Sequence, residues 1–219
     1  MISFNQVKSD SVIKTYIEYA DKCLSTLGYT EHSFAHVGLV AHRTKYILDT
    51  LGYSEREIEL GMIAAYMHDI GNAVNRKDHS QSGALMAFRV LDKMGMDAEE
   101  LVKIVAAIGN HDEGDGVAVN PLAAALIISD KSDVRRTRVR NRDFTTFDIH
   151  DRVNYSAVSS ELTIGEGKDT ILLEIEIDTK YSSVMEYFEI FLGRMVLCRK
   201  AAERLGLAFH LSINGQRLL

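Results

Sequence analysis

The sequence predicts a mainly α-helical protein with a small α+β unit at its C-terminal end. Apolar side chains recur at helical spacing over roughly the first 130 residues, in segments bounded by capping residues and glycines. The chain contains one proline, Pro121, and is rich in Ala, Leu, Ile and Glu, which favours long helices. After about residue 160, short segments with partly alternating apolar and polar residues indicate β-strands instead.

Six helices are expected in the N-terminal part of the chain. Gly28 and Gly52 end the first two, because glycine readily takes the left-handed conformation found after a helix. Ser54 and Asp97 each precede a glutamate by three residues, which is the pattern of a capping box. Pro121 suits the first turn of the last helix, which contains the apolar run LAAALII. The expected helices span residues 10–27, 33–51, 54–71, 80–94, 97–110 and 121–130.

The C-terminal third is expected to form a β-β-α-β unit. Its elements are two strands within residues 161–178 around a turn at 165–168, a helix at 182–205 and a strand at 208–213. Residues 131–152 show no clear period and are predicted to form a long functional loop. We therefore predict a helical domain at 1–157 and a small unit at 158–219, which packs on the helices or builds a homodimer interface.

Composition and charge exclude several classes of protein. The formal net charge of −6 does not favour a protein that coats long nucleic acid. Cys23 and Cys198 lack the spacing of a metal or redox pair and are typical of buried thiols in a reducing cytoplasm. The first residues lack the features of a signal peptide, and no apolar run approaches the ~20 residues of a membrane span. We expect a cytoplasmic protein without a membrane partner.

His68 and Asp69 stand at the end of the strongly apolar third helix. The small residues Gly61, Ala64 and Ala65 share one helical face with this histidine, which leaves room for another helix or a ligand. Ionisable side chains at the end of a buried helix must be hydrogen-bonded or bound to a metal, because an unpaired buried charge is very costly. Taken alone, the dipeptide fits equally well a helix end where histidine caps carbonyls and aspartate faces water.

Two further residues favour a metal site. His36 flanks the apolar stripe of the second helix, and Asp130 ends the apolar run of the sixth, where an aspartate has little other reason to be. Two His and two Asp from three helices form a mixed nitrogen and oxygen ligand set, which suits Fe, Mn, Ni, Zn or Mg and leaves positions open for water and substrate. The expected ligands are His36, His68, Asp69 and Asp130.

The order and spacing of these residues resemble a known family. His36, then His68-Asp69-Ile70-Gly71, then Asp130 resemble the H…HD…D signature of the HD-domain phosphohydrolase superfamily, over about residues 30–135. The resemblance implies an HD-domain helical bundle with the metal at its centre, and an enzyme that hydrolyses phosphate mono- or diesters, often of nucleotides. In such a site the metal lowers the pKa of a bound water towards ~7, with His68 and Asp69 as the catalytic residues.

The same resemblance implies a larger site. Binuclear branches of the superfamily carry extra histidines in the intervals that here contain His79 and His111, so these residues are candidates to bind a second metal or phosphate. One or two divalent ions are therefore expected. Asp112 would bind metal or orient His111. The alternative interpretation leaves His79 beside a polar turn and His111 in a solvent-exposed loop.

One position departs from the pattern of the family. Many relatives carry a lysine shortly after His-Asp, where this chain has Asn72, and the change removes one expected phosphate contact. Other cations are candidates to replace it, since arginine binds phosphate through two parallel hydrogen bonds. These candidates are Arg76, Lys77, Arg135 and Arg136. The last two belong to a group of five arginines in residues 135–142, which also fits a solvated loop paired with aspartates.

Four other histidines are left outside the predicted site. His150 is followed by an aspartate, but no apolar helix leads into it. His32 and His42 are expected on the surface or on another side of the second helix, and His210 is expected to be structural on a strand.

The leading functional hypothesis is a metal-dependent phosphohydrolase whose partner is a small phosphorylated substrate, such as a nucleotide. One alternative is a nucleotide-sensing protein with little turnover, although the presence of all four ligands argues against a degenerate site. Another is an alarmone- or RNA-directed hydrolase, suggested by the arginine-rich segment, although the net charge makes long nucleic acid an unfavourable substrate.

Overall fold

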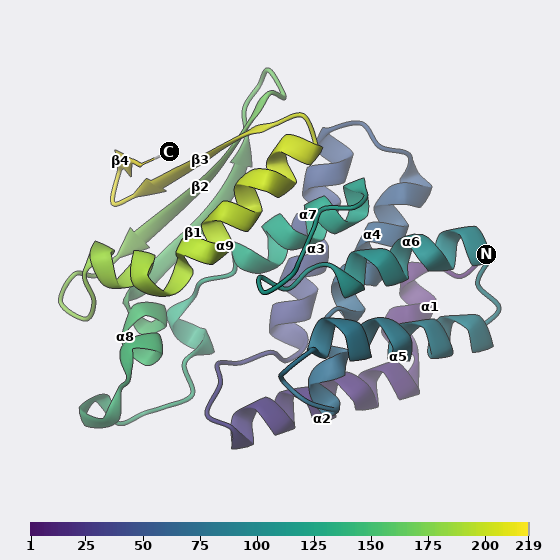
Figure 1. Ribbon diagram of the computed structural model, residues 1–219, viewed down its shortest axis with the longest axis horizontal. Helices are drawn as coiled ribbons and strands as arrows, with labels where there is room; N and C mark the ends of the chain where they lie inside the picture. The colour runs from purple at the N-terminus through teal and green to yellow at the C-terminus, as the bar shows by residue number, and fades with distance from the viewer. Residues whose placement is uncertain (219) are drawn as a thin grey trace.

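Helices form most of the chain, and a small sheet lies towards its C-terminal end, as the sequence predicts (Figure 1). The computed structural model describes residues 1–218. Ser54 and Asp97 cap their helices, and Asn120 caps the helix that begins at the only proline of the chain. The helices of this part are α1 (Phe4–Ser9), α2 (Ser11–Thr26), α3 (Phe34–Thr50), α4 (Glu55–Met67), α5 (His79–Lys93), α6 (Ala98–Gly109) and α7 (Pro121–Lys131).

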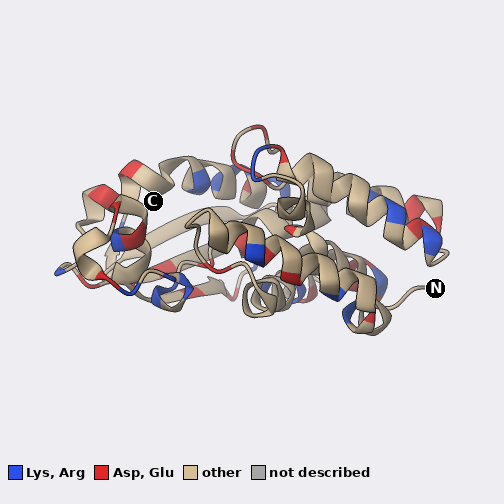
Figure 2. Ribbon diagram, turned by 90° about the horizontal axis from the view of Figure 1, so that it is seen from below, with Lys and Arg blue, Asp and Glu red and all other residues tan. Residues whose placement is uncertain are grey.

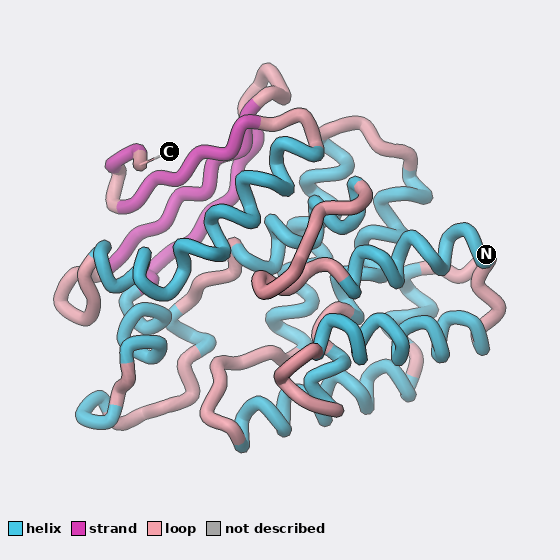
Figure 3. Tube along the Cα trace, in the orientation of Figure 1, coloured by secondary structure: helices cyan, strands magenta, loops and turns pink. Residues whose placement is uncertain are grey.

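The C-terminal part contains the expected β-β-α-β unit and one more short strand. Its elements are α8 (Ile149–Ser156), β1 (Ala157–Ile164), β2 (Thr170–Ile177), α9 (Val184–Arg204), β3 (Ala208–Ile213) and β4 (Gln216–Arg217). The sheet order is β1-β2-β3-β4; the helix α9 connects the parallel strands β2 and β3, and the other two pairs are antiparallel. Figure 3 shows α9 lying along one face of this sheet.

Three segments differ from the sequence-based expectation. A short helix, α1, precedes the first expected one and is held by a capping box between Ser3 and Gln6. The third expected helix ends at Met67, and a tight 3₁₀ turn at Ile70–Ala73 follows. The predicted loop at 131–152 contains two 3₁₀ turns and the start of α8, which was missed because a helix of eight residues carries too few apolar positions to show a period.

Two buried apolar clusters share the helices α3 and α7. Val40 of α3 and Leu126 of α7 belong to the cluster inside the helical bundle. Leu48 of α3 and Ile128 of α7 belong to the second cluster, which they form with the sheet and α9. The helix α7 is therefore apolar on all sides, and Asp130, which is only partly exposed, lies at its polar C-terminal end.

Glycines bring helices close together at two points that position the site. A Cβ atom on Gly61 of α4 would lie 2.6 Å from Leu48 Cδ1, so α3 and α4 pack closely there. A Cβ atom on Gly71 would lie 1.9 Å from the carbonyl oxygen of His79 and 2.4 Å from the backbone nitrogen of Gly83. The 3₁₀ turn after Asp69 therefore rests directly on the start of α5.

Charged residues of both signs are interspersed along the helices in the view of Figure 2. Among the described helices, none combines the length and the apolar character needed to cross a membrane.

Candidate metal centre

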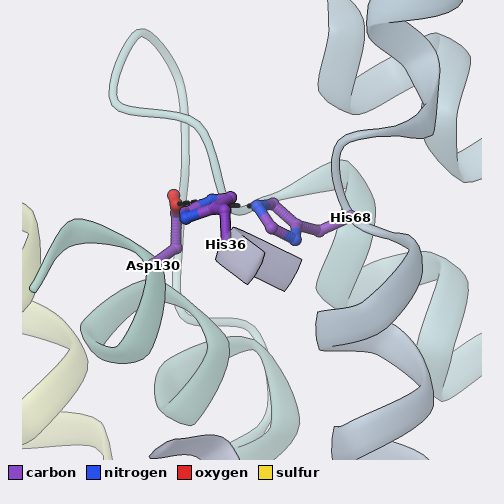
Figure 4. A group of neighbouring side chains, drawn as sticks. All are labelled: His36, His68 and Asp130. Carbon is purple, nitrogen blue, oxygen red and sulfur yellow. Dashed lines mark ion pairs between the residues drawn. The ribbon is translucent and has the colours of Figure 1, made fainter. Parts of the chain in front are cut away.

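Four side chains from three parts of the bundle converge at the end of α7. Figure 4 shows His36, His68 and Asp130 pointing towards one another from α3, the end of α4 and α7. His36 Nε2 lies 3.2 Å from Asp130 Oδ1, and His68 Nε2 lies 3.2 Å from Asp69 Oδ2. The two remaining cross distances, from His36 Nε2 to Asp69 Oδ2 and from His68 Nε2 to Asp130 Oδ1, are each 3.5 Å. The structure thus brings the four expected ligands together.

A hydrogen bond at Nδ1 orients each of the four histidines of the site. Since the partner is a carbonyl or carboxylate oxygen in every case, Nδ1 is the donor and Nε2 is the ring atom that could bind a metal. The acceptors are Asp133 Oδ2 for His36 (2.7 Å), Ala65 O for His68 (2.7 Å), Ile108 O for His111 (2.7 Å) and Arg76 O for His79 (3.0 Å).

The donor set fits a divalent metal ion. His36 Nε2, His68 Nε2 and Asp69 Oδ2 are buried and have no hydrogen-bond partner within residues 1–218 apart from the 3.2–3.5 Å ion-pair contacts of the cluster itself. An unsatisfied buried polar atom costs about 1–3 kcal/mol, so three that face one point indicate a shared ligand. The ligand atoms of His36, His68 and Asp130 all lie within 4.8 Å of one another, as do those of His68, Asp69 and His111. A cation in contact with these atoms would satisfy all of them.

His79 and His111 extend the site on the other side of Asp69. Their Nε2 atoms lie 3.3 Å apart and each carries a lone pair; Arg76 Nη1, 3.4 Å away, donates to that of His79, and a metal ion between the two rings would relieve their repulsion directly. His79 Nε2 is also 3.5 Å from Asp69 Oδ1. The two carboxylate oxygens of Asp69 therefore face two different groups of histidines, an arrangement that suits two neighbouring cations.

Burial and charge set the protonation of these groups. Burial lowers the pKa of His111 to about 3 and also lowers the pKa of His79, so both are neutral at pH 7. Burial acts on His68 in the same direction, but Asp69 and Asp130 outweigh it and raise the pKa of His68 to about 10. Without a metal, His68 thus keeps the proton that compensates the two carboxylates, and a metal ion would displace that proton.

Sequence reasoning missed two buried neighbours of the ligands. Asp133, one turn after Asp130, holds His36 through the 2.7 Å hydrogen bond at Nδ1. Lys131 has its Nζ 2.8 Å from Asp130 Oδ2 and 3.8 Å from Asp112 Oδ1. Asp112 therefore faces Lys131, and it does not orient His111, whose Nδ1 hydrogen-bonds to a backbone carbonyl. Lys131 is a cation directly beside a predicted metal ligand.

Asn72 links a predicted ligand to a second cation. Its Nδ2 donates to both the backbone oxygen and Oδ1 of Asp69, each at 2.9 Å, and its Oδ1 accepts from Arg76 Nη1 at 3.3 Å. The Arg76 guanidinium lies 5.5 Å from the centre of the Tyr29 ring and lines the pocket. Lys77 is exposed and does not line this pocket.

The arginine-rich segment takes a different place from the one expected. The Arg135 guanidinium pairs with Asp133 through two hydrogen bonds. The Arg136 guanidinium lies 4.6 Å from the Tyr155 ring centre and 5.4 Å from that of Tyr181. Neither arginine lines the pocket over the ligands, so both are engaged in the packing of the segment.

A pocket of about 430 Å³ is lined by Asp69, His79, His111 and Asp130, whereas His36 and His68 are fully buried behind it. The segment that follows α2 forms one side, α8 another, and Phe191 and Arg194 of α9 a third. His32 and His150, which sequence reasoning left outside the site, both line this pocket. His32 is not a surface residue: it is half-buried, because the segment before α3 folds over the site and its ring centre lies 5.3 Å from that of His36.

A helical bundle with a mixed His and Asp centre at the end of a buried helix defines the class of this protein. The sequence model of the HD domain family matches residues 33–151, which is more than half of the chain. The chain belongs to the HD domain family, which confirms the resemblance to the superfamily of metal-dependent phosphohydrolases. It is also 24% identical over 212 residues to an uncharacterized protein of Methanocaldococcus jannaschii, a match that covers 85% of this chain and 79% of that protein.

Proposed function

We propose that this protein is a metal-dependent phosphohydrolase that cleaves a phosphate ester of a small molecule or nucleotide with water activated by the metal. The observation that carries the proposal is the convergence of His36 Nε2, His68 Nε2 and Asp69 Oδ2, which are buried and have no hydrogen-bond partner among residues 1–218 beyond their ion-pair contacts with one another and with Asp130, beside a pocket that Asp69 and Asp130 line. A purely structural cluster would not leave such atoms unsatisfied beside a pocket.

His36, His68, Asp69 and Asp130 are the residues that would hold the first ion. His79 and His111 would hold a second one together with Asp69. When bound, divalent ions of this kind acidify a coordinated water and neutralise charge on phosphate oxygens. Fe, Mn, Ni, Zn and Mg are all candidates, because the ligand set contains both imidazole and carboxylate.

The remaining polar residues bind and orient the substrate. Lys131 and Arg76 line the pocket and would neutralise the negative charge that builds up on the phosphoryl oxygens. Asn72 holds the Asp69 carboxylate through its 2.9 Å hydrogen bond, which would keep Asp69 in one orientation for binding a metal or accepting a proton. His68 Nδ1–H donates to the Ala65 carbonyl oxygen, which leaves Nε2 directed into the site.

The pocket supports a small substrate. About 430 Å³ is within the range of small-molecule sites, and the surrounding walls come from three sides. The net charge of −6 disfavours long nucleic acid, which binds through many phosphate contacts to basic surfaces.

A screen of phosphate esters tests the proposal. Purified protein loaded with Mn or Fe is incubated with phosphomonoesters, cyclic diesters and dinucleoside polyphosphates, and phosphate release is measured. We expect turnover of at least one class, and one or two divalent ions per chain by metal analysis. The double variant His68→Ala with Asp69→Ala should lose both, whereas Asp92→Asn, at an exposed position of α5, should keep both.

Two outcomes would contradict these expectations in different ways. Metal and phosphatase activity retained in the double variant would refute the site assignment. Tight nucleotide binding by the wild-type protein without turnover of any ester would favour the sensing role over the enzyme.

A further inference from the structure

A residue outside the matched family segment reaches the pocket of the metal centre. Arg194 lies on α9, and its side chain lines the same pocket as Asp130 and Lys131 at the end of α7. The two helices pack directly on one another, and Figure 1 shows α9 passing beside α7. The C-terminal unit thus supplies one wall of the proposed active site.

The guanidinium of Arg194 is held in place, but only one of its N–H groups donates a hydrogen bond within the described residues. Its Nε donates to Glu113 Oε2 at 2.9 Å, and its Cζ lies 4.4 Å from the centre of the Phe191 ring. No other residue of the described chain hydrogen-bonds to it, and 27% of the side chain is exposed. The four N–H groups on Nη1 and Nη2 therefore remain available to a ligand in the pocket.

Its one acidic partner belongs to a glycine-rich loop. Glu113 lies two residues after His111 and directly before Gly114, where an added Cβ would meet no atom within 4 Å. Within residues 1–218, the Glu113 carboxylate pairs with Arg194 alone, through a single oxygen. A phosphate group offers more, because its oxygens accept two parallel hydrogen bonds from the fork of a guanidinium.

We propose that Arg194 binds a phosphate group of the substrate, and that the Glu113 carboxylate occupies this guanidinium until a phosphate replaces it. The inference rests on the proposed function, since it requires a phosphate ester to enter the pocket. It makes the C-terminal unit part of the substrate site, and it makes Glu113 a competitor that weakens the binding of anions.

Inorganic phosphate is the probe, and its Kd for the metal-loaded protein is measured by calorimetry. We expect Arg194→Gln to weaken phosphate binding by about tenfold or more, the equivalent of one lost charge-assisted contact. Glu113→Gln should strengthen it by about two- to fivefold, the usual range of an exposed ion pair. Arg199→Gln, at an exposed position of the same helix and outside the pocket, is the matched control and should change it less than twofold.

The opposite signs of the two effects separate ligand binding from a structural role. If the ion pair served only to hold α9 against the loop, either variant would break it equally. A decrease in phosphate affinity of the same size in both variants would therefore overturn the proposal. Metal content and thermal stability are measured alongside, and Arg194→Lys should recover part of the affinity because it restores the charge without the fork.

The test distinguishes this inference from the proposed function. If the wild-type protein hydrolyses an ester while both variants keep Kd and KM within twofold, the assignment of Arg194 fails and the enzyme assignment stands. If the protein hydrolyses no ester yet shows the two opposite effects on phosphate binding, the assignment of Arg194 stands and the enzyme assignment fails.

Discussion

Replacement of Gly71 by alanine tests how the fold positions the metal centre. The added Cβ would lie 1.9 Å from the His79 carbonyl oxygen and 2.4 Å from the Gly83 nitrogen. Both atoms belong to the backbone at the start of α5, so no side-chain rotation relieves the clash, and the 3₁₀ turn must move away from α5. Overpacking typically costs about 1–3 kcal/mol, and a clash with backbone belongs at the upper end of that range.

The expected loss is large enough to measure by thermal unfolding. For a chain of this size, each kcal/mol shifts Tm by about 2–4 °C, so Gly71→Ala should lower Tm by about 6–12 °C. The displaced turn carries Asp69 and Asn72, so the affinity for metal should fall as well. Both quantities are followed on one preparation, by circular dichroism and by competition with a chelator.

The matched control is Gly38→Ala in α3, where an added Cβ would meet no atom within 4 Å. Alanine at an unhindered helical position stabilises by about 0.5–1 kcal/mol, so the control should raise Tm by a few degrees. A Gly71→Ala protein with wild-type Tm and metal affinity would refute the claim that close contact between the turn and α5 sets the geometry of the site.

Three further predictions concern protonation and the residues around the ligands. Asp133→Asn should weaken metal binding by about 10–100-fold, or about 1.4–2.8 kcal/mol, because the 2.7 Å bond to His36 loses its charge; an unchanged Kd in chelator competition would count against this role. Metal binding should release about one proton per chain near pH 7, because the carboxylates raise the pKa of His68 to about 10, whereas the lowered pKa values of His79 and His111 leave both already neutral. Metal affinity should therefore rise about tenfold per pH unit between pH 6 and 8, and calorimetry in buffers of different ionisation enthalpy would expose a binding step without proton release. Arg136→Gln should cost about 1 kcal/mol of stability through its lost contacts with Tyr155 and leave KM within twofold; a large rise in KM would show that this arginine reaches the substrate after all.

The helices and the central ligands could be anticipated because they leave local signals in the sequence. Capping residues and apolar periodicity mark α2 to α7, and the family match at 33–151 confirms the resemblance built on His36, His68, Asp69 and Asp130. Each of these residues stands where a charged or polar side chain interrupts an apolar pattern, which is why the sequence singles it out.

Other parts of the site carry no such signal. Asp133 and Lys131 lie at the start of a segment without periodicity, and their contacts depend on how the chain turns after α7. Arg194 follows Phe191 on a helix whose pattern indicates a core face, so nothing local points to the pocket. Arg136 shows the converse: a dense group of arginines suggested phosphate binding, and the structure places this one between two tyrosine rings.

The sharing of α3 and α7 between the two apolar clusters bears on how this protein can be divided. Removal of the chain after residue 157 would uncover Ile47, Leu48, Ile127 and Ile128, which are buried against the sheet and α9. Exposure of four such side chains costs about 6–12 kcal/mol, which is comparable to the whole stability of a typical domain. We therefore expect the segment that matches the family to fold in this chain only together with its C-terminal extension.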